Sequence, residues 1–561
     1  MIAPTVAVGP RRIAWIEPAR LPHGVDDQNI YTGVLFPRGG PKMAAILREL
    51  GYEVEVISGE LSPIDHEAIA RDFDLACISV LSNTAPHGLV LGRWLTELGL
   101  PVVMGGYQFA HRGTTPACMA PTEEALDFVP YVIRGEGYVA LPQFLEALGG
   151  QRPLSTVGGL SYRDARGQTI HNEPAELLSR EAINELPPAD WHAIRDRDQM
   201  VVAAVHGMQG CPRNCSWCAV WPRDGRSDRN NDPLRFVDEL EAVLSSGNYL
   251  SVFFSADNFP AFHRWATEIC QEITRRGLDL DWSCQAEVGA IRHTEMVDAM
   301  VAAGCGRWCL GLESINPASL SDSNKRQTRE TMEACINELH RRGLQVHGMF
   351  IVGLPHDTPE SVAATVAWAK RMKIETCQFL CLIDLPGSED YEQYNLAEKS
   401  FRPFTGAYEP LNWMFVNGHY ARLGNETMSV ADVQAATEKA MLSFYTVPRA
   451  LAPLFHFNLA HFRSMRARGH GFWRSLRTTV LHQLFVSGLR FRGVVNIARW
   501  KANPINIAYR RLVKAEPWQS EPLMEQMLFC LPSAWLRTLE RVHRERLERR
   551  EQLGREQTVA G

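Results

Sequence analysis

The sequence has no run of the roughly 18 consecutive apolar residues that a membrane-spanning helix requires. Its N-terminal stretch also lacks the basic start and apolar run of a secretory signal, so we expect a cytoplasmic protein. Thirteen cysteines in 561 residues are too few for a disulfide-stabilised scaffold, so cysteines with special spacing should be ligands or redox groups. The small net charge of −6 excludes a polybasic arm, and no nucleic-acid-binding module is recognisable; no nucleic acid partner is expected.

The chain does contain two alternations of short apolar strands with helices. Its length suggests three or four folded units at roughly 100–200 residues each. In residues 1–150, strands such as 75–82 and 101–106 are almost uniformly apolar. Such strands indicate an α/β unit with a doubly wound, Rossmann-like parallel sheet, which binds ligands beyond the carboxyl ends of its strands. Residues 151–195 are predicted to be a linker with small strands.

The second alternation lies in residues 196–400 and predicts a barrel. Six strand and helix repeats indicate a partial (β/α)6 barrel of the TIM type, whose functional loops follow the carboxyl ends of the strands. Asp257 and Asn258 come at the end of the second of these strands and are expected either to face the barrel mouth or to cap the loop. Residues 401–561 are predicted to form a mainly helical, basic C-terminal domain.

Part of this last domain has an unusual charge distribution. Residues 449–514 include thirteen basic side chains and no Asp or Glu, interleaved with aromatic residues. Gly469, Gly471 and Gly488 are expected to divide the segment into short helices. Three interpretations stay open: a helical cap with a solvated charged face, a peripheral contact with an anionic membrane surface, or a site for an anionic substrate or partner.

Three cysteines lie on one loop directly after the first predicted barrel strand. Cys211, Cys215 and Cys218 have the spacing C-x3-C-x2-C. Three thiolates on such a loop can ligate three irons of a [4Fe-4S] cluster and leave the fourth iron open to a small molecule. A structural zinc site requires four ligands, and the neighbouring sequence offers no fourth Cys or His at a matching spacing. The spacing favours a cluster over the alternatives, a zinc knuckle or three ordinary cysteines.

This motif, with Trp217 immediately before its last cysteine, resembles the signature of the radical S-adenosylmethionine (SAM) superfamily. Segments 302–317 and 348–361 resemble the patterns of that family's fourth and fifth barrel strands. The resemblance implies that the open iron of the cluster chelates SAM. It also implies that Glu313 and Ser314 contact SAM and that Trp217 lies near the adenine or the cluster.

The domain in front resembles the cobalamin-binding domain of cobalamin-dependent radical SAM proteins. Hydroxyl groups and glycine backbone amides at strand ends are suited to contact a corrin or a nucleotide-like tail. The positions that this resemblance implies as cobalamin contacts are Ser79, Ser82, Thr84, Gly105, Gly106, Gly135 and Glu136. The Asp-x-His-x-x-Gly motif that supplies a cobalt ligand in methionine-synthase-like domains is absent, so the lower axial ligand stays open, with His23 and His87 in nearby predicted loops. The alternative is a relic domain that only packs on the barrel or shapes the substrate entrance.

These resemblances together imply an enzyme that uses a [4Fe-4S] cluster, SAM and cobalamin, and that receives electrons from an external donor of the flavodoxin or ferredoxin type. The leading hypothesis is methylation of an unactivated carbon in a lipophilic or anionic small molecule, through a 5′-deoxyadenosyl radical and methylcobalamin. The first alternative is a radical oxidative cyclase or rearrangement enzyme without methyl transfer, similar to the Mg-protoporphyrin cyclases. The second is a non-enzymatic iron–sulfur electron carrier or sensor.

Overall fold

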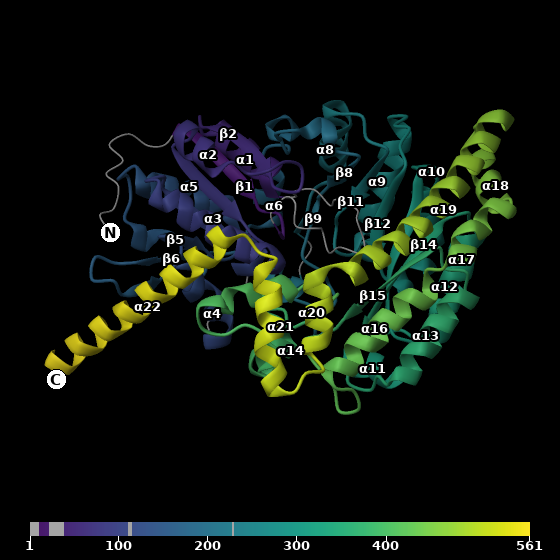
Figure 1. Cartoon of the computed structure of the whole chain (residues 1–561). Helices are drawn as coiled ribbons and strands as arrows, with labels where there is room; N and C mark the ends of the chain where they lie inside the picture. The colour runs from purple at the N-terminus through teal and green to yellow at the C-terminus, as the bar shows by residue number, and fades with distance from the viewer. Residues whose placement is uncertain (1–10, 22–38, 110–114, 227–228, 561) are drawn as a thin grey trace.

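The computed structural model describes residues 11–21, 39–109, 115–226 and 229–560. They form an α/β part at the N-terminus, a second α/β part and a C-terminal run of helices (Figure 1). The predicted α/β class, with parallel sheets and a separate helical region, is confirmed. His23 lies outside the described residues.

The first sheet has seven strands, of which the first five pair in parallel. They are β1 (Arg12–Glu17), β2 (Glu53–Ser58), β3 (Leu75–Ser79), β4 (Val102–Gly105), β5 (Tyr131–Ile133), β6 (Leu160–Arg163) and β7 (Thr169–His171). Their order, β2-β1-β3-β4-β5-β6-β7, begins with the 2-1-3-4-5 order of flavodoxin-like doubly wound sheets. The last two strands are antiparallel and come from the segment predicted as a linker, 151–195, so part of that segment extends the sheet.

Helices connect the parallel strands of this sheet in two groups, since α1 contacts α5 and α2 contacts α3. The helices of this part are α1 (Gly39–Glu49), α2 (His66–Asp72), α3 (Ala85–Glu97), α4 (Pro116–Ala125), α5 (Gly137–Leu148) and α6 (Arg180–Glu185). Side-chain caps mark the starts of α2 and α4: the Asp65 side chain accepts a hydrogen bond from the Ala68 amide, and the Thr115 side chain accepts one from the Cys118 amide. These caps fix where α2 and α4 begin.

The second sheet is an open barrel of six parallel strands. They are β8 (Val202–Val205), β11 (Ser251–Phe254), β12 (Trp282–Ala286), β13 (Cys305–Glu313), β14 (Gln345–Val352) and β15 (Thr376–Cys381). The strands follow one another in chain order, from β8 at one edge to β15 at the other. A small antiparallel pair, β9 (Met208–Gln209) with β10 (Arg229–Asn230), stands apart from the main sheet. The six-stranded partial barrel predicted from the sequence is therefore present.

Helices alternate with these strands along the chain. They are α7 (Val220–Asp224), α8 (Pro233–Ser246), α9 (His263–Arg275), α10 (Thr294–Ala302), α11 (Pro317–Asp322), α12 (Arg329–Arg341), α13 (Pro359–Arg371), α14 (Glu389–Gln393) and α15 (Leu396–Lys399). The helices α12 and α13 start with reciprocal capping boxes at Thr328 and Thr358, which satisfy amides that the first helical turn leaves without partners.

The C-terminal part is helical and reaches back to the first sheet. Its helices are α16 (Val430–Phe444), α17 (Val447–Leu451), α18 (Leu459–Ala467), α19 (Phe472–Ala502), α20 (Pro504–Leu512), α21 (Pro517–Phe529) and α22 (Ser533–Ala560). The last of these lies along the first α/β part (Figure 1), where Trp94 Nε1 donates a hydrogen bond to Thr538 Oγ1 at 2.8 Å. Arg93 also forms an ion pair with Glu545 at 2.8 Å. These contacts tie the two ends of the chain together.

The prediction that Gly488 separates short helices is wrong. Helix α19 runs for 31 residues and passes through Gly488 without a break. A single glycine inside a helix costs only about 1 kcal/mol relative to Ala, which packing against neighbouring elements can offset. One such contact is at Gly493, where an added Cβ would lie 2.6 Å from the Tyr445 ring. No helix in the described ranges is long and apolar enough to cross a membrane.

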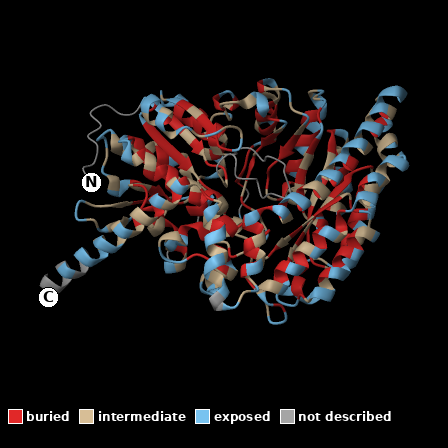
Figure 2. Cartoon of the chain, in the orientation of Figure 1, coloured by how far each residue is buried: buried red, intermediate tan, exposed pale blue. Residues whose placement is uncertain are grey.

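Burial is concentrated in the two sheets, as the red ribbons of Figure 2 show. Within the barrel, Phe254 and Trp282 stack with ring centroids 4.1 Å apart. Buried aromatic pairs of this kind stabilise a fold beyond the apolar area that they remove from water. The loops that follow the strand ends carry the candidate site.

Candidate functional site

A cavity of about 740 Å³ lies where the carboxyl ends of the first sheet face the loops of the barrel. This volume is within the range of small-molecule sites. The first sheet lines it with Trp15, Glu17, Ser58, Ser79, Val80, Thr84, Gly105, Gly106, Tyr107, Gly135, Glu136 and Tyr138. The barrel lines it with Gln209, Val220, Arg223, Asp224, Asp257, Gln378 and Leu380, and the C-terminal part with Asn417 and His419.

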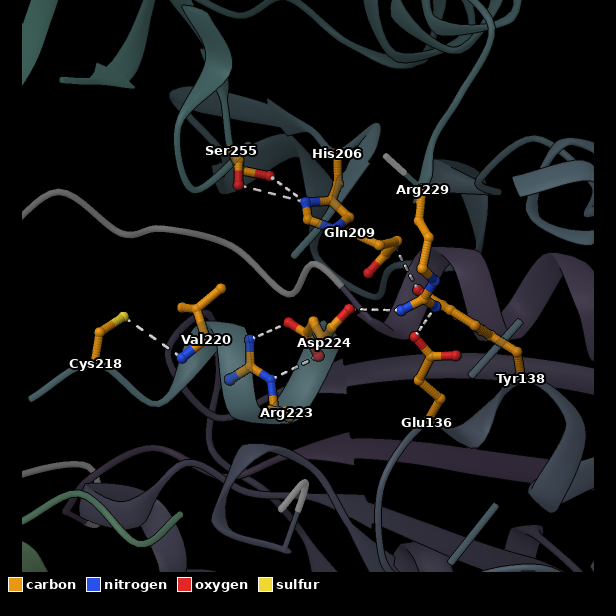
Figure 3. Close-up of polar contacts among 10 residues, drawn as sticks. All are labelled: Glu136, Tyr138, His206, Gln209, Cys218, Val220, Arg223, Asp224, Arg229 and Ser255. Carbon is orange, nitrogen blue, oxygen red and sulfur yellow. Dashed lines mark hydrogen bonds and ion pairs between the residues drawn. The ribbon is translucent and has the colours of Figure 1, made fainter. Parts of the chain in front are cut away.

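The three spaced cysteines lie on the loop between the β8–β9 segment and α7. Cys211, Cys215 and Cys218 are all partly exposed and free of disulfides. The amide of Val220 donates to Cys218 Sγ at 3.5 Å, and Val220 itself lines the cavity (Figure 3). The helix that follows the cysteines thus forms part of the cavity wall.

Backbone geometry closes this loop. Gly210 has a φ of +86°, and an added Cβ would lie 2.4 Å from the carbonyl oxygen of Gly225, so only glycine fits there. The amide of Cys211 donates to the same carbonyl at 3.2 Å. Trp221 Nε1 donates to the Cys215 carbonyl at 3.1 Å. The two ends of the loop are therefore fastened to each other.

Asp257 and Asn258, which follow the second barrel strand, have different positions in the structure. Asp257 lines the cavity, whereas Asn258 is buried and fastens the strand ends to each other. Asn258 Nδ2 donates to a carboxylate oxygen of Glu287 at 3.1 Å, and its Oδ1 accepts from the Glu287 amide at 3.2 Å. Glu287 also forms an ion pair with Arg213, which lies between the first two cysteines. Asn258 therefore supports the cysteine loop through Glu287 and Arg213.

A second support joins the loop to the first sheet. Arg229 is buried and donates to the carbonyl oxygens of Asp224 at 2.8 Å and Leu178 at 2.7 Å (Figure 3 shows the first). It also forms an ion pair with Glu136, a residue predicted to contact cofactor. The Glu136 carboxylate further accepts from the Leu178 amide at 3.2 Å. Glu136 lines the cavity, but its carboxylate already pairs with Arg229 and the Leu178 amide, and so connects the first sheet to the cysteine loop.

The predicted SAM-side residues Glu313 and Ser314 are buried at the end of β13. Glu313 has a φ of +59° beside a register shift, a conformation uncommon for a non-glycine residue. Lys325 Nζ donates to Glu313 Oε1 at 2.9 Å and lies 6.0 Å from the Trp217 ring centroid. Trp217 Nε1 is buried without a hydrogen-bond partner in the described structure. Lys325 thus connects two predicted positions near the cysteines.

The strand-end positions of the first sheet fall into two groups. Ser79, Gly105 and Gly135 line the cavity, and an added Cβ at Gly135 would meet no atom within 4 Å. Gly106 also lines it, but it has a φ of +100° and an added Cβ would lie 2.5 Å from the Val80 amide nitrogen. Glycine is therefore required at Gly106 for the close approach of two strand ends.

The hydroxyl positions after β3 differ from each other. Thr84 Oγ1 accepts from the Leu81 amide at 2.9 Å and so closes the short turn, although Thr84 also lines the cavity. Ser82 begins this turn and is not among the residues that line the cavity, within the described part of the chain. His87 lies on α3, where its Nδ1 is 2.9 Å from the Ala19 carbonyl oxygen and its ring lies 5.0 Å from that of Trp535. These contacts assign His87 to packing against the C-terminal helix.

The cavity also contains groups that the sequence analysis did not single out. The Arg223 guanidinium lies 4.0 Å from the Tyr107 ring centroid and pairs with Asp224, so α7 meets the first sheet directly (Figure 3 shows the ion pair). Gln209 Nε2 donates to the Tyr138 hydroxyl at 3.3 Å across the same interface. No sequence spacing marks the contacts of Arg223 with Tyr107 and of Gln209 with Tyr138, because the partners are 71 or more residues apart.

Residues 205–369, which contain the cysteine loop and Glu313, match the model of the radical SAM superfamily. The chain contains a radical SAM domain. The resemblance predicted from the cysteine spacing is thereby confirmed.

Relatives of this chain include proteins named as methyltransferases and proteins named as cyclases. The chain is 26% identical to an uncharacterized methyltransferase of Pyrococcus horikoshii, over 74% of this chain and 89% of that protein. It is 27% identical to the anaerobic magnesium-protoporphyrin IX monomethyl ester cyclase of Rubrivivax gelatinosus, over 49% of this chain and 53% of that protein. These relatives support an enzyme.

Two solved structures share the overall arrangement. The radical SAM methyltransferase TsrM from Kitasatospora setae, with cobalamin and a [4Fe-4S] cluster bound, has a TM-score of 0.59 at 18% identity and covers 86% of this chain and 100% of that one. The cobalamin-dependent SAM radical enzyme OxsB, with aqua-cobalamin and SAM bound, also has a TM-score of 0.59, at 12% identity, and covers 96% of this chain and 80% of that one. At these identities the likeness establishes the fold.

The donor set of the radical SAM domain fits a [4Fe-4S] cluster. Its three thiols lie on one fastened loop, and a cluster places each cysteine sulfur on a different iron, so the ligands need not converge on one point. Within the described ranges, no three His, Cys, Asp or Glu side chains converge on a site for one metal ion. Burial raises the pKa of Cys218 to about 12, so ligation has to displace the thiol proton.

The ion pair beside this loop should be essential to stability. Lys325 and Glu313 are 17% and 6% exposed, so removing one partner leaves the other charge buried and unpaired. We expect Lys325→Met to lower the free energy of unfolding of the cluster-free protein by about 3–5 kcal/mol. The double variant Glu313→Gln/Lys325→Met should lose less free energy of unfolding than the two single variants lose together. Urea denaturation measures all three losses. Additive losses would show that the two charges do not interact.

A buried carboxyl on the opposite wall should make stability depend on pH. Burial raises the pKa of Glu17 from its ordinary 4.5 to about 7, against hydrogen bonds from Trp15 Nε1 and the Gly40 amide. Between these pH values the folded protein holds a proton that the unfolded chain releases, so stability falls as pH rises through this window.

Glu17→Gln removes this titration. We take the difference in free energy of unfolding between the variant and the wild-type protein near pH 4.5 as the reference. Between pH 4.5 and pH 8 we expect this difference to change by roughly 1–3 kcal/mol in favour of the variant. Urea denaturation of the cofactor-free protein across this range measures the difference. Parallel pH profiles for the two proteins would contradict the assignment.

Proposed function

We propose that the chain is a cobalamin-dependent radical SAM methyltransferase whose cobalamin and SAM meet across the 740 Å³ cavity. The observation that carries the proposal is the shared lining: strand ends of the first sheet form one wall, and α7, which directly follows the cysteine loop, forms another. Bound cluster and SAM supply a 5′-deoxyadenosyl radical that removes hydrogen from a substrate carbon, and cobalamin supplies the methyl group.

The residues of each wall suit these roles. The cobalamin contacts would be Ser79, Gly105, Gly106 and Gly135, which line the cavity. The cluster ligands would be Cys211, Cys215 and Cys218 and the SAM contacts Glu313, Ser314 and Trp217, none of which is among the described residues that line the cavity itself. The open space beside Gly135 supports close approach of a large planar ligand to the backbone. Trp15, Tyr107 and Tyr138 add aromatic surface to the same wall.

Residues of the barrel and the C-terminal part close the cavity on its other side. Asn417 and His419 line it together with Gln378. Burial lowers the pKa of His419 to about 3, so its imidazole is neutral at physiological pH. His419 therefore adds no charge to this wall, to which the barrel contributes the charged side chains of Arg223, Asp224 and Asp257.

The substrate and the electron source are the finer parts of the proposal. The basic and aromatic segment 449–514 supports a lipophilic or anionic small molecule as substrate. Reducing equivalents are proposed to come from an external donor of the flavodoxin or ferredoxin type.

Methyl transfer can be tested without knowing the substrate. The full-length protein, reconstituted anaerobically with cluster and cobalamin, is reduced and mixed with SAM that carries a deuterated methyl group. We expect S-adenosylhomocysteine and a corrin that carries the deuterated methyl, both measured by mass spectrometry. The same mixture without protein is the control for direct reaction between the two cofactors.

Two results would contradict the proposal in different ways. 5′-Deoxyadenosine without methyl transfer to the corrin would favour a radical cyclase or rearrangement, the activity class of the Rubrivivax relative. No consumption of SAM at all would leave an iron–sulfur electron carrier or sensor.

A further inference from the structure

The helix α19 presents its polar side to the protein and its apolar side to solvent. Its buried residues are mostly small or polar and include Ser475, Thr479, Ser487, Arg490 and Asn496. Soluble helices show the opposite arrangement, with the apolar stripe toward the core. The polarity of this helix is therefore inverted over most of its 31 residues.

Hydrogen bonds confirm that the polar side is the side that packs. Arg490 Nε donates to the Glu375 carbonyl oxygen at 2.6 Å, which fastens the helix to the start of β15. Ser487 Oγ donates to the Ala450 carbonyl oxygen at 2.7 Å. Polar contacts thus hold the inner face, and a rotation that hid the apolar side would break these bonds.

The outer side is a continuous apolar face. Trp473, Val480, Leu484 and Phe491 follow one another at spacings of seven, four and seven residues, and Leu481 lies next to Val480, which places them on one side of a helix; all are exposed. Trp473 is 77% exposed. Figure 2 shows this stretch of α19 and the adjacent α18 largely exposed at the upper right of the molecule. Monomeric soluble proteins rarely expose such a contiguous apolar surface without a partner.

Positive charge accompanies the apolar face. Arg477, Arg492 and Arg499 are exposed and share its helical spacing. The segment 449–514, which includes the helix, has thirteen basic residues and no acidic one. A second copy of the same face would bring like charges together, whereas an anionic surface would be attracted to it.

We propose that the outer face of α19 docks on an anionic phospholipid bilayer, with the helix lying in the plane of the membrane surface. Aromatic and leucine side chains would enter the headgroup region while arginines contact lipid phosphates, the arrangement typical of interfacial helices. This docking surface lies outside the cavity and does not depend on the proposed reaction.

The test is co-sedimentation of the purified full-length protein with sucrose-loaded vesicles. We expect binding to vesicles of phosphatidylcholine and phosphatidylglycerol in equal amounts at low salt, release at high salt, and little binding to pure phosphatidylcholine. Trp473→Ser/Leu481→Ser/Leu484→Ser should weaken the partition coefficient at least about 100-fold. Arg477→Gln/Arg492→Gln should weaken it about 30-fold at low salt.

Matched controls change equally exposed residues elsewhere. Leu250→Ser/Phe529→Ser removes side chains that are 77% and 92% exposed, and Arg544→Gln/Arg550→Gln removes two exposed charges of α22. Both controls should bind like the wild-type protein, and all variants should keep its thermal unfolding midpoint, since only exposed side chains are changed.

Three outcomes would overturn the proposal. The first is equal binding to neutral and anionic vesicles, and the second is no binding to either. The third is a dimer in solution that the Trp473→Ser/Leu481→Ser/Leu484→Ser variant converts to a monomer, since a second copy would then occupy the face.

Discussion

Replacing the three cysteines of the loop, Cys211→Ala/Cys215→Ala/Cys218→Ala, is expected to abolish both cluster content and the formation of 5′-deoxyadenosine from SAM. The thiols are the only ligands that this loop offers, and a cluster cannot assemble on it without thiolates. Iron and sulfide analysis after anaerobic reconstitution, followed by mass spectrometry of the SAM products, measures both losses. We expect iron at the level of background and a product yield below detection.

A variant at another cysteine separates ligation from general loss of a thiol. Cys335 is a buried residue of α12, and Cys335→Ala should keep a full complement of iron and sulfide. If the triple variant retained its iron, or if Cys335→Ala lost it to the same extent, the assignment of the cluster to this loop would be wrong.

Gly106→Ala is expected to expel cobalamin while the cluster is retained. The new Cβ would lie 2.5 Å from the Val80 amide nitrogen and 2.6 Å from its carbonyl oxygen, at a φ of +100° that L residues rarely adopt. The strand ends that line the cavity must then move apart. We expect a loss of about 3 kcal/mol in the free energy of unfolding and at least a tenfold lower cobalamin content per chain.

Gly135→Ala is the matched control for this change. Gly135 also has a positive φ, +81°, but an added Cβ there meets no atom within 4 Å. The backbone penalty alone should cost about 1–2 kcal/mol. Urea denaturation gives the stabilities, and the corrin absorption of the purified protein gives the cobalamin content. Equal corrin content in both variants would remove Gly106 from the cobalamin wall.

Much of this architecture could be predicted from local sequence. Apolar strands that alternate with helices define both parallel sheets, because strands buried on two faces need continuous apolar runs. The cysteine spacing identified the radical SAM domain, since ligand chemistry fixes residue type and separation together. Glu313 and Gly106 were named from the family resemblance; the structure places Glu313 at the end of β13 and Gly106 directly after β4, and their contacts with cofactors stay predictions.

Other features depend on contacts between distant parts of the chain. Glu136 was predicted as a cofactor contact, and the structure shows in addition that its carboxylate pairs with Arg229, 93 residues later. The predicted break at Gly488 failed because tertiary packing outweighs the helix propensity of one glycine. Such pairings are set by the fold, and no single stretch of sequence contains them.

The central proposal is that one protein chain binds both a SAM-binding cluster and cobalamin, with the two meeting at the same cavity. Electron paramagnetic resonance of the anaerobically reconstituted, reduced protein, recorded before and after addition of SAM, tests it directly when the corrin content of the sample is known. We predict one cobalamin per chain and a reduced-cluster signal that SAM shifts. A signal that SAM leaves unchanged, or a protein that retains no corrin, would contradict it.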